Sequence, residues 1–154
     1  MSSAQLLVTG EKFTGHGFRA LDPVIEELVD SAKFEITIIA YVISPFAIDF
    51  LAILRKALKR GINVTLIVNR LDEQPHEITR FLSGLESDFS KFRLKSFASG
   101  KSIVHAKAIV VDRTTAIVGS ANLTWGGFVY NHEICVLLKG EPASRLASLL
   151  DTVS

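Results

Sequence analysis

The first 70 residues alternate between two kinds of hydrophobic pattern. In some stretches apolar residues recur at helical spacing, and dense runs of β-branched residues separate these stretches. Residues 36–43 are apolar at nearly every position, which is typical of a central strand covered on both faces. The pattern therefore predicts an α/β fold in which a mixed central β-sheet is flanked by helices on both faces.

Local signals set approximate bounds for the elements. Asp22 before Pro23 and Ser44 before Pro45 each place a capping side chain ahead of a proline, so Asp22 and Ser44 are the predicted N-caps. Gly61 is predicted to end the second helix. The expected helices span 22–33, 44–60, 75–84 and 142–150. The expected strands span 5–9, 36–43, 62–68, 92–97, 103–111, 115–118 and 133–139.

Length and composition bound the class of protein. A chain of 154 residues with 48% hydrophobic content can build one core, and we expect a single domain over residues 1–154. The formal net charge of +1 excludes a generally basic surface, so any attraction for phosphate must be local. No apolar run is long enough to cross a membrane, and the N-terminus lacks a secretory pattern. A cytoplasmic protein is predicted, in which the lone Cys135 is a buried free thiol.

Two basic side chains interrupt the apolar segment 103–111. His105 and Lys107 are two residues apart, so in a strand both would project from the same face. Burying an imidazole and an ammonium group without partners is costly, and an anion, either bound or transient, is their natural partner. The pair therefore predicts chemistry at an anionic group.

A polar turn follows the next predicted strand. Gly119, Ser120 and Asn122 place a hydroxyl, an amide and backbone N–H groups at its end, and such donors bind phosphate. Glu133 begins the following predicted strand and is the nearest downstream carboxylate able to accept a hydrogen bond from an imidazole N–H. These residues are the candidates for the remainder of the site.

Together these residues resemble the HKD signature of the phospholipase D superfamily. The signature H-x-K-x4-D-x6-G-S-x-N is filled at every fixed position, by His105, Lys107, Asp112, Gly119, Ser120 and Asn122. Asn131-His132-Glu133 resembles the N-x-E element that the family often carries downstream. Within the superfamily the chain is similar to single-motif bacterial endonucleases of the Nuc group, and its α/β order is similar to a phospholipase D-like half-domain.

The resemblance implies a covalent two-step mechanism without a metal or other cofactor. The motif histidine attacks phosphorus and forms a phosphohistidine, a second histidine protonates the leaving oxygen, and water then releases the phosphate. His105 would be the nucleophile in one copy and the acid or base in the other. Lys107 and Asn122 would hold the non-bridging oxygens, Ser120 would support them, and Glu133 would orient His105.

Asp112 belongs to the signature but is the weakest catalytic candidate. Strand alternation turns it away from His105 and Lys107. We therefore expect Asp112 to be a structural partner of nearby backbone or side chains.

The implied mechanism needs two histidines at one phosphate, and this chain carries one motif. None of His16, His76 and His132 has a lysine two residues later. The second half of the site must then come from another chain. A homodimer with both His105 side chains near its two-fold axis is the simplest arrangement, and the resemblance to single-motif endonucleases implies the same assembly.

Basic residues near the motif are candidates for substrate binding. Lys91, Arg93 and Lys95 share one face of a predicted strand, and Lys101 lies between them and the motif. They form either a basic stripe that leads toward the motif or the solvated face of an edge strand, where lysines also discourage aggregation.

Two aromatic residues are candidates for stacking on a nucleic-acid base. Trp125 follows the polar turn and is the better candidate. Tyr41 lies in the apolar run 36–43 and is assigned to the core.

The leading hypothesis is hydrolysis of DNA or RNA phosphodiester bonds, with three alternatives. A metal site built from His105, His132 and Glu133 is disfavoured, because alternation puts the last two on opposite strand faces. A lipid phosphodiesterase or transferase is the serious rival, although cardiolipin synthases and phospholipases of bacteria usually carry two motifs per chain. A noncatalytic nucleic-acid-binding subunit is the third, since superfamily domains of this size also occur in restriction and anti-phage defence proteins.

Overall fold

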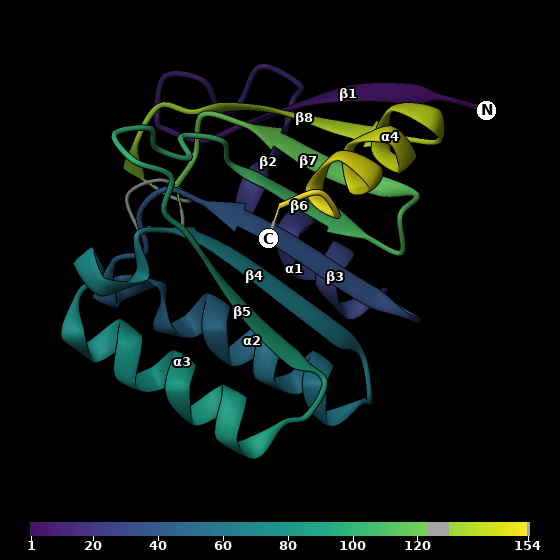
Figure 1. The fold of residues 1–154 in the computed structure, drawn as a ribbon. Helices are drawn as coiled ribbons and strands as arrows, with labels where there is room; N and C mark the ends of the chain where they lie inside the picture. Colours follow the sequence, from purple (N-terminus) through teal and green to yellow (C-terminus); the bar gives the residue numbers. More distant parts are fainter. Residues whose placement is uncertain (123–129, 154) are drawn as a thin grey trace.

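The computed structural model describes residues 1–122 and 130–153, and within them eight strands form one mixed sheet (Figure 1). The strands are β1 (Ser3–Val8), β2 (Arg19–Ala20), β3 (Glu35–Ala40), β4 (Asn63–Asn69), β5 (Phe92–Phe97), β6 (Ala108–Val111), β7 (Thr115–Gly119) and β8 (Ile134–Lys139). Their order across the sheet is β2-β1-β8-β7-β6-β3-β4-β5. β3, β4 and β5 are parallel, whereas β6, β7 and β8 form an antiparallel meander.

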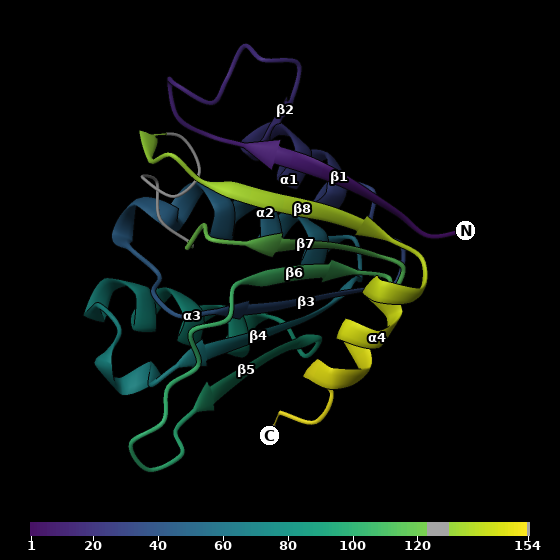
Figure 2. The same cartoon turned by 90° about the horizontal axis from the view of Figure 1, so that it is seen from above.

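Helices cover both faces of the sheet, so the predicted fold class is confirmed. They are α1 (Leu21–Asp30), α2 (Ile48–Lys59), α3 (His76–Asp88) and α4 (Glu141–Leu150). α1, α2 and α3 lie on one face, and α4 lies on the other, against β3, β6, β7 and β8 (Figures 1 and 2). α2 and α3 are the crossovers that connect the parallel neighbours β3, β4 and β5.

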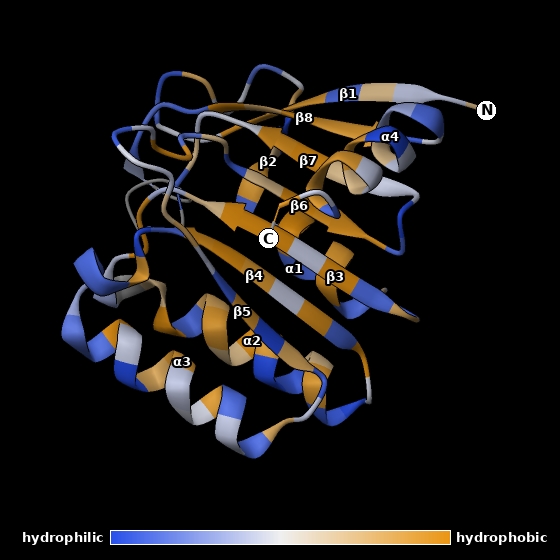
Figure 3. Ribbon diagram, viewed as in Figure 1, coloured by the Kyte–Doolittle hydropathy of each residue, from blue (hydrophilic) through white to orange (hydrophobic). Residues whose placement is uncertain are grey.

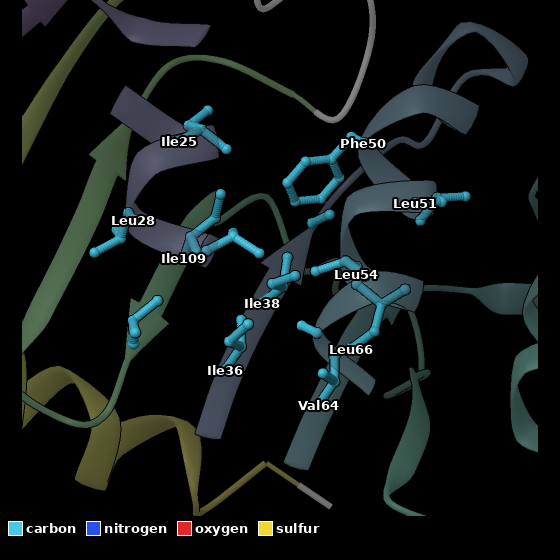
Figure 4. Close-up of a cluster of buried hydrophobic side chains, with 14 of the residues drawn as sticks. Ile25, Leu28, Ile36, Ile38, Phe50, Leu51, Leu54, Val64, Leu66 and Ile109 are labelled. Atoms are coloured by element: carbon cyan, nitrogen blue, oxygen red, sulfur yellow. The ribbon is translucent and has the colours of Figure 1, made fainter. Parts of the chain in front are cut away.

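Two apolar layers follow from the alternation of side chains along the strands. Ile36 and Ile38 of β3 face α1 and α2, whereas Ile39 faces α4. Figure 4 shows the larger layer, to which α1 and α2 contribute Ile25, Leu28, Phe50, Leu51 and Leu54. Burying one such side chain stabilises the fold by about 1.5–3 kcal/mol. In contrast, β5 alternates between apolar and polar positions, as expected of an edge strand (Figure 3).

The predicted helix cap is wrong at Asp22, whereas Ser44 occupies the N-cap position of the 3₁₀ turn that leads into α2. Ala20 is the N-cap of α1, and Asp22 lies in the first turn, where its carboxylate is near the positive end of the helix dipole. Ser44 precedes a 3₁₀ turn, Pro45–Ala47, and its hydroxyl makes no cap bond. Gly61 follows α2 with a φ of 88°, which fits the predicted helix stop.

Several element ends also differ from the prediction, among them those of β3, α3 and β6. β3 ends at Ala40 rather than residue 43, α3 runs to Asp88 rather than residue 84, and β6 begins at Ala108 rather than residue 103. His105 and Lys107 therefore lie in the connection that leads into β6 and not in the strand itself. The end of β3, the start of β6, the end of β7 and the start of β8 meet at one edge of the sheet. This edge carries the candidate site.

Candidate active site

His105 and Lys107 meet without the help of a strand. Lys107 Nζ lies 3.2 Å from His105 Nδ1 and donates to the His105 carbonyl oxygen at 2.9 Å. The His105 side chain is exposed, and Lys107 is half-buried. The imidazole and the ammonium group thus converge as predicted, but through contacts within the connection before β6 and not through strand alternation.

Tyr41 borders this pair, and its assignment to the core is wrong. It follows β3 directly, is half-buried, and its ring centroid lies 4.8 Å from that of His105, with the ring planes inclined by 50°. Lys107 Nζ lies 5.9 Å from the same centroid, within the range of a cation–π interaction. One signal in the sequence marked this position: α/β sites form beyond the carboxyl ends of parallel strands, where Tyr41 lies.

Ser120 and Glu133 form a second pair at the junction of β7 and β8. Ser120 Oγ donates a hydrogen bond to Glu133 Oε2 and accepts one from the Ile134 N–H at 3.2 Å. The resemblance placed Glu133 against His105, but in the described part of the chain the Glu133 side chain is bonded to Ser120 instead. This bond uses one carboxylate oxygen of Glu133, and the orienting contact to His105 stays a prediction.

Gly119 connects the two pairs. Its N–H donates to the Lys107 carbonyl oxygen at 3.3 Å. A Cβ atom on Gly119 would lie 2.5 Å from both Cys135 Sγ and the Ile134 carbonyl oxygen, so only glycine fits here. Burial raises the pKa of the Cys135 thiol, although the backbone N–H groups of Ala121 and Ser120 oppose this effect. Cys135 is thus the buried thiol that the sequence predicts.

The end of the signature lies at the boundary of the described residues. Asn122 is half-buried, and within those residues its Oδ1 has no hydrogen-bond partner. Trp125, the predicted stacking residue, lies outside the described part of the chain.

A cleft of about 630 Å³ opens beside these residues. His105, Lys107 and Ser120 line it where it meets the edge of the sheet. Its apolar wall is formed largely by α4 and the residues that follow, with Leu146, Leu149, Leu150 and Val153. The cleft is therefore polar at the candidate catalytic residues and apolar toward α4.

Asp112 lies at the other end of β6, in the turn to β7. Its carboxylate accepts the backbone N–H groups of Lys33, Phe34 and Glu35 at 2.8, 2.8 and 2.9 Å. Burial acts to raise the pKa of Asp112, but these N–H donors outweigh burial and hold the pKa below its ordinary value. Asp112 thus ties the start of β3 to the β6–β7 turn, in the backbone role that was expected of it.

Lys91, Arg93 and Lys95 lie just before β5 and within it, beside the end of α4. Lys91 Nζ donates to the Gly61 carbonyl oxygen at 2.8 Å, and Lys95 Nζ donates to the Val153 carbonyl oxygen at 2.9 Å. With Arg93 they line a separate hollow of about 370 Å³, which they share with Glu35, Thr37, Asn63, Thr65, Leu150 and Asp151. This hollow adjoins the cleft at Leu150, and the stripe toward the motif stays a prediction. Two of the lysines bind carbonyl oxygens of their own chain.

Lys101 differs from the residues of β5. It is exposed in the turn that precedes the His105 connection, and no other described residue pairs with its ammonium group. Among Lys91, Arg93, Lys95 and Lys101, Lys101 is also the closest to His105 in sequence.

His132 faces the N-terminal loop rather than the cleft. Its Nε2 accepts the Lys12 N–H at 3.1 Å, and its ring meets Phe13 edge to face, with centroids 5.1 Å apart. The structure does not bring His132 to His105. Among the described residues, no three His, Cys, Asp or Glu side chains are grouped so that they could hold a metal ion.

Sequence comparison agrees with the motif and with the fold. Residues 25–152 match the family described as cardiolipin synthase, PLD-like domain, so the chain belongs to the phospholipase D superfamily of phosphodiesterases. DISARM protein DrmC from Bacillus paralicheniformis is 32% identical over 151 residues, which cover 97% of this chain. The chain spans 62% of the length of DrmC.

Two solved structures share the fold over nearly their whole length. Nuc from Salmonella typhimurium, described as a phospholipase D family member, superposes with a TM-score of 0.76 at 24% identity, over 99% of this chain and 94% of Nuc. NucT from Helicobacter pylori superposes with a TM-score of 0.80 at 18% identity, over 99% of this chain and 96% of NucT. In the described residues, no helix has the length and apolar character needed to cross a bilayer.

Proposed function

We propose that this chain is a metal-independent phosphodiesterase that cleaves DNA or RNA through a phosphohistidine, at a site shared by two copies. The observation that carries the proposal is the convergence of His105 and Lys107, 3.2 Å apart, on a cleft in a member of the phospholipase D superfamily. An accessible imidazole beside an ammonium group suits attack on an anionic phosphodiester, because the ammonium offsets the charge that would repel the nucleophile.

The reaction has two displacements at phosphorus. In the first, Nε2 of one His105 attacks, a P–N bond forms, and the bond to the leaving oxygen breaks while His105 of the second copy donates a proton to that oxygen. In the second, the same partner histidine takes a proton from water, and the water oxygen attacks phosphorus as the P–N bond breaks. The products are an alcohol and a phosphate monoester, and both imidazoles return to their starting states.

The neighbouring side chains supply charge and orientation. Lys107 and Asn122 would hold the non-bridging oxygens, and removing one such donor typically costs about 10²–10³ in kcat. Glu133 would accept the Nδ1–H of the attacking His105, because a carboxylate can accept this bond together with the one from Ser120. Ser120 would support this arrangement.

The second copy is proposed to dock over the apolar wall of the cleft. His105 is exposed beside this wall, and Leu149 of α4 is 62% exposed. Exposed apolar side chains next to a polar site mark an interaction surface. A two-fold axis close to His105 would cover this wall and bring two imidazoles to one phosphate.

Nucleic acid is the proposed substrate, and a phospholipid is the second candidate. The single motif of the chain, its similarity to Nuc and NucT, and the exposed Lys101 before the motif support nucleic acid. The apolar wall of the cleft favours a phospholipid instead, since it would suit an acyl chain. We place the enzyme in the cytoplasm, and a defence system is a proposed context for it.

A matched assay tests the proposal. Single-stranded DNA, duplex DNA, RNA and phosphatidylglycerol vesicles are incubated with the wild-type chain, with His105→Ala and with His76→Ala, all in excess chelator. His76 lies on α3 and is the control for loss of a histidine outside the site. We expect cleavage of nucleic acid by wild type and His76→Ala and none by His105→Ala. Cleavage of the lipid alone would contradict the nucleic-acid substrate, and binding of nucleic acid without cleavage would indicate a noncatalytic subunit.

A further inference from the structure

We propose that Asn69 and Gln74 are positioning residues, which hold His105 and Tyr41 in place from behind the site. Neither residue belongs to the HKD signature. The effect on turnover rests on the function proposed above, whereas the effect on the placement of His105 does not.

Asn69 anchors the backbone next to His105. It is the last residue of β4, is 5% exposed, and its Oδ1 accepts the Val104 N–H at 3.0 Å. The Val104 side chain is itself buried, in the apolar layer under α4. His105 thus follows a residue that is fixed both by its N–H group and by its side chain.

This anchor matters because the His105 connection has no strand partners. The ladder of β6 begins only at Ala108, which pairs with Ile39 and Val118. Before it, Gly119 holds the Lys107 carbonyl oxygen and Asn69 holds Val104. His105 lies between these two attachments, and its own carbonyl oxygen accepts Lys107 Nζ, so losing one attachment would loosen its backbone.

Gln74 anchors the backbone of Tyr41, whose ring packs on His105. Its Nε2 donates to the carbonyl oxygens of Tyr41 at 3.1 Å and of Asn69 at 2.6 Å, and its Oε1 accepts the Ile43 N–H at 3.2 Å. One side-chain amide therefore ties the chain after β3 to the end of β4. Gln74 is connected to the imidazole ring of His105 through Tyr41, which packs on that ring. It is connected to the backbone next to His105 through Asn69, which binds the Val104 N–H.

The two amides belong to one network, and its effect on catalysis follows from geometry. A nucleophile displaced by about 1 Å loses up to about 10² in rate, because the reacting atoms no longer meet in line. The network does not touch the substrate. Its loss should therefore lower kcat and leave KM nearly unchanged.

The test uses shape-conserving variants and reads His105 directly. Asn69→Leu removes the acceptor for Val104, and Gln74→Met removes both ends of the amide at a less buried position. Leu85→Ala is the matched control, because it removes buried apolar contacts on α3, away from the cleft. The proton resonances of the His105 ring report its place beside Tyr41, since the ring current of a phenol at 4.8 Å shifts them. Melting temperature and circular dichroism report the fold.

We expect Asn69→Leu and Gln74→Met to move the His105 ring resonances toward exposed-histidine values. We also expect kcat to fall by about 10-fold to 10²-fold, with KM within about 2-fold of wild type. Leu85→Ala should lower the melting temperature and leave the resonances in place. Native His105 resonances in a folded Gln74→Met protein would overturn the proposal, as would equal displacement in Leu85→Ala. A wild-type chain without phosphodiesterase activity would instead refute the proposed function, while the resonances still decide the positioning role.

Discussion

Lys107 Nζ lies 3.2 Å from Nδ1 of His105, so a protonated lysine donates to that nitrogen and the ring proton belongs on Nε2. The proposed nucleophile needs the opposite tautomer, with a lone pair on Nε2 and a proton on Nδ1. Glu133, the residue proposed to accept that proton, is bonded to Ser120. The free protein therefore holds His105 in a resting arrangement that an incoming phosphate has to change.

Inorganic phosphate is expected to draw Lys107 from His105 to the anion. A phosphate oxygen is a charged acceptor and a stronger partner for an ammonium group than a neutral imidazole. The measurement is the ¹⁵N spectrum of the His105 ring at constant pH, in which Nδ1 should shift as phosphate is added. Lys107→Met is the control. Because this variant has no ammonium group to move from His105 to phosphate, its His105 Nδ1 signal should not shift in this way. An unchanged spectrum at phosphate concentrations that saturate binding by calorimetry would contradict this idea.

Gly119→Ala is expected to damage both the fold and the site. The new Cβ would lie 2.5 Å from Cys135 Sγ and the Ile134 carbonyl oxygen, which forces β7 and β8 apart where Ser120 meets Glu133. Overpacking of this kind typically lowers the free energy of unfolding by about 1–3 kcal/mol. Urea unfolding measures this loss. Adding Cys135→Ala should not restore stability, because the backbone oxygen remains. A stable, fully active Gly119→Ala protein would show that the strands can separate without harm.

The order of elements was predictable, apart from the two-residue strand β2, because each of the others depends on a local pattern. β5 has the predicted bounds of 92–97, and apolar and basic residues alternate over its first four positions. The segment 103–107 was misassigned because Ile103 and Val104 look like strand residues. Its backbone is instead held by Asn69, which lies 35 positions away in sequence.

The same limit applies to the site. The spacing of His105 and Lys107 predicted that the two side chains meet, because that contact is local. The place of Tyr41 beside them depends on β6 lying next to β3, and sheet order is not encoded in any short segment. The Ser120–Glu133 pair likewise depends on how β7 and β8 meet. Motif spacing thus predicted the residues proposed to react, whereas their packing partners required the fold.

Asp112→Asn is expected to lower stability in a pH-dependent way. The pKa of Asp112 is depressed in the folded chain, so the charged carboxylate contributes stability that is fully present above its unfolded value near 3.8. That contribution is lost as pH falls through the still lower folded pKa. The variant keeps the shape and tolerates the positive φ of 51° at this position. Asp112→Asn should lower the free energy of unfolding by about 1–3 kcal/mol at pH 7, because hydrogen bonds to a charged group are lost.

Urea unfolding of wild type and Asp112→Asn between pH 7 and pH 2.5 tests this expectation. The difference between the two proteins should shrink as pH falls below about 3.8, because the carboxyl is protonated first in the unfolded chain and at still lower pH in the folded chain. Asp151→Asn is a useful comparison, because Asp151 pairs with Arg113 at an exposed position and its effect should be smaller and weakened by salt. If the difference in unfolding free energy between wild type and Asp112→Asn stays constant with pH, the carboxylate charge is not its cause.

Leu149→Glu is expected to separate the proposed dimer and to abolish turnover with it. The substitution places a carboxylate on the apolar wall beside His105, and burying that charge without a partner would outweigh the apolar contacts of the interface. Phe34→Glu is the matched control. Phe34 is 70% exposed and directly precedes β3, at the end of this strand that lies away from the candidate site. Light scattering should show a monomer for Leu149→Glu and a dimer for Phe34→Glu.

Because one site needs both copies of His105, an excess of His105→Ala chains should also suppress wild-type activity by forming mixed dimers. A Leu149→Glu monomer with full activity would refute the shared site, since one chain carries only one motif histidine.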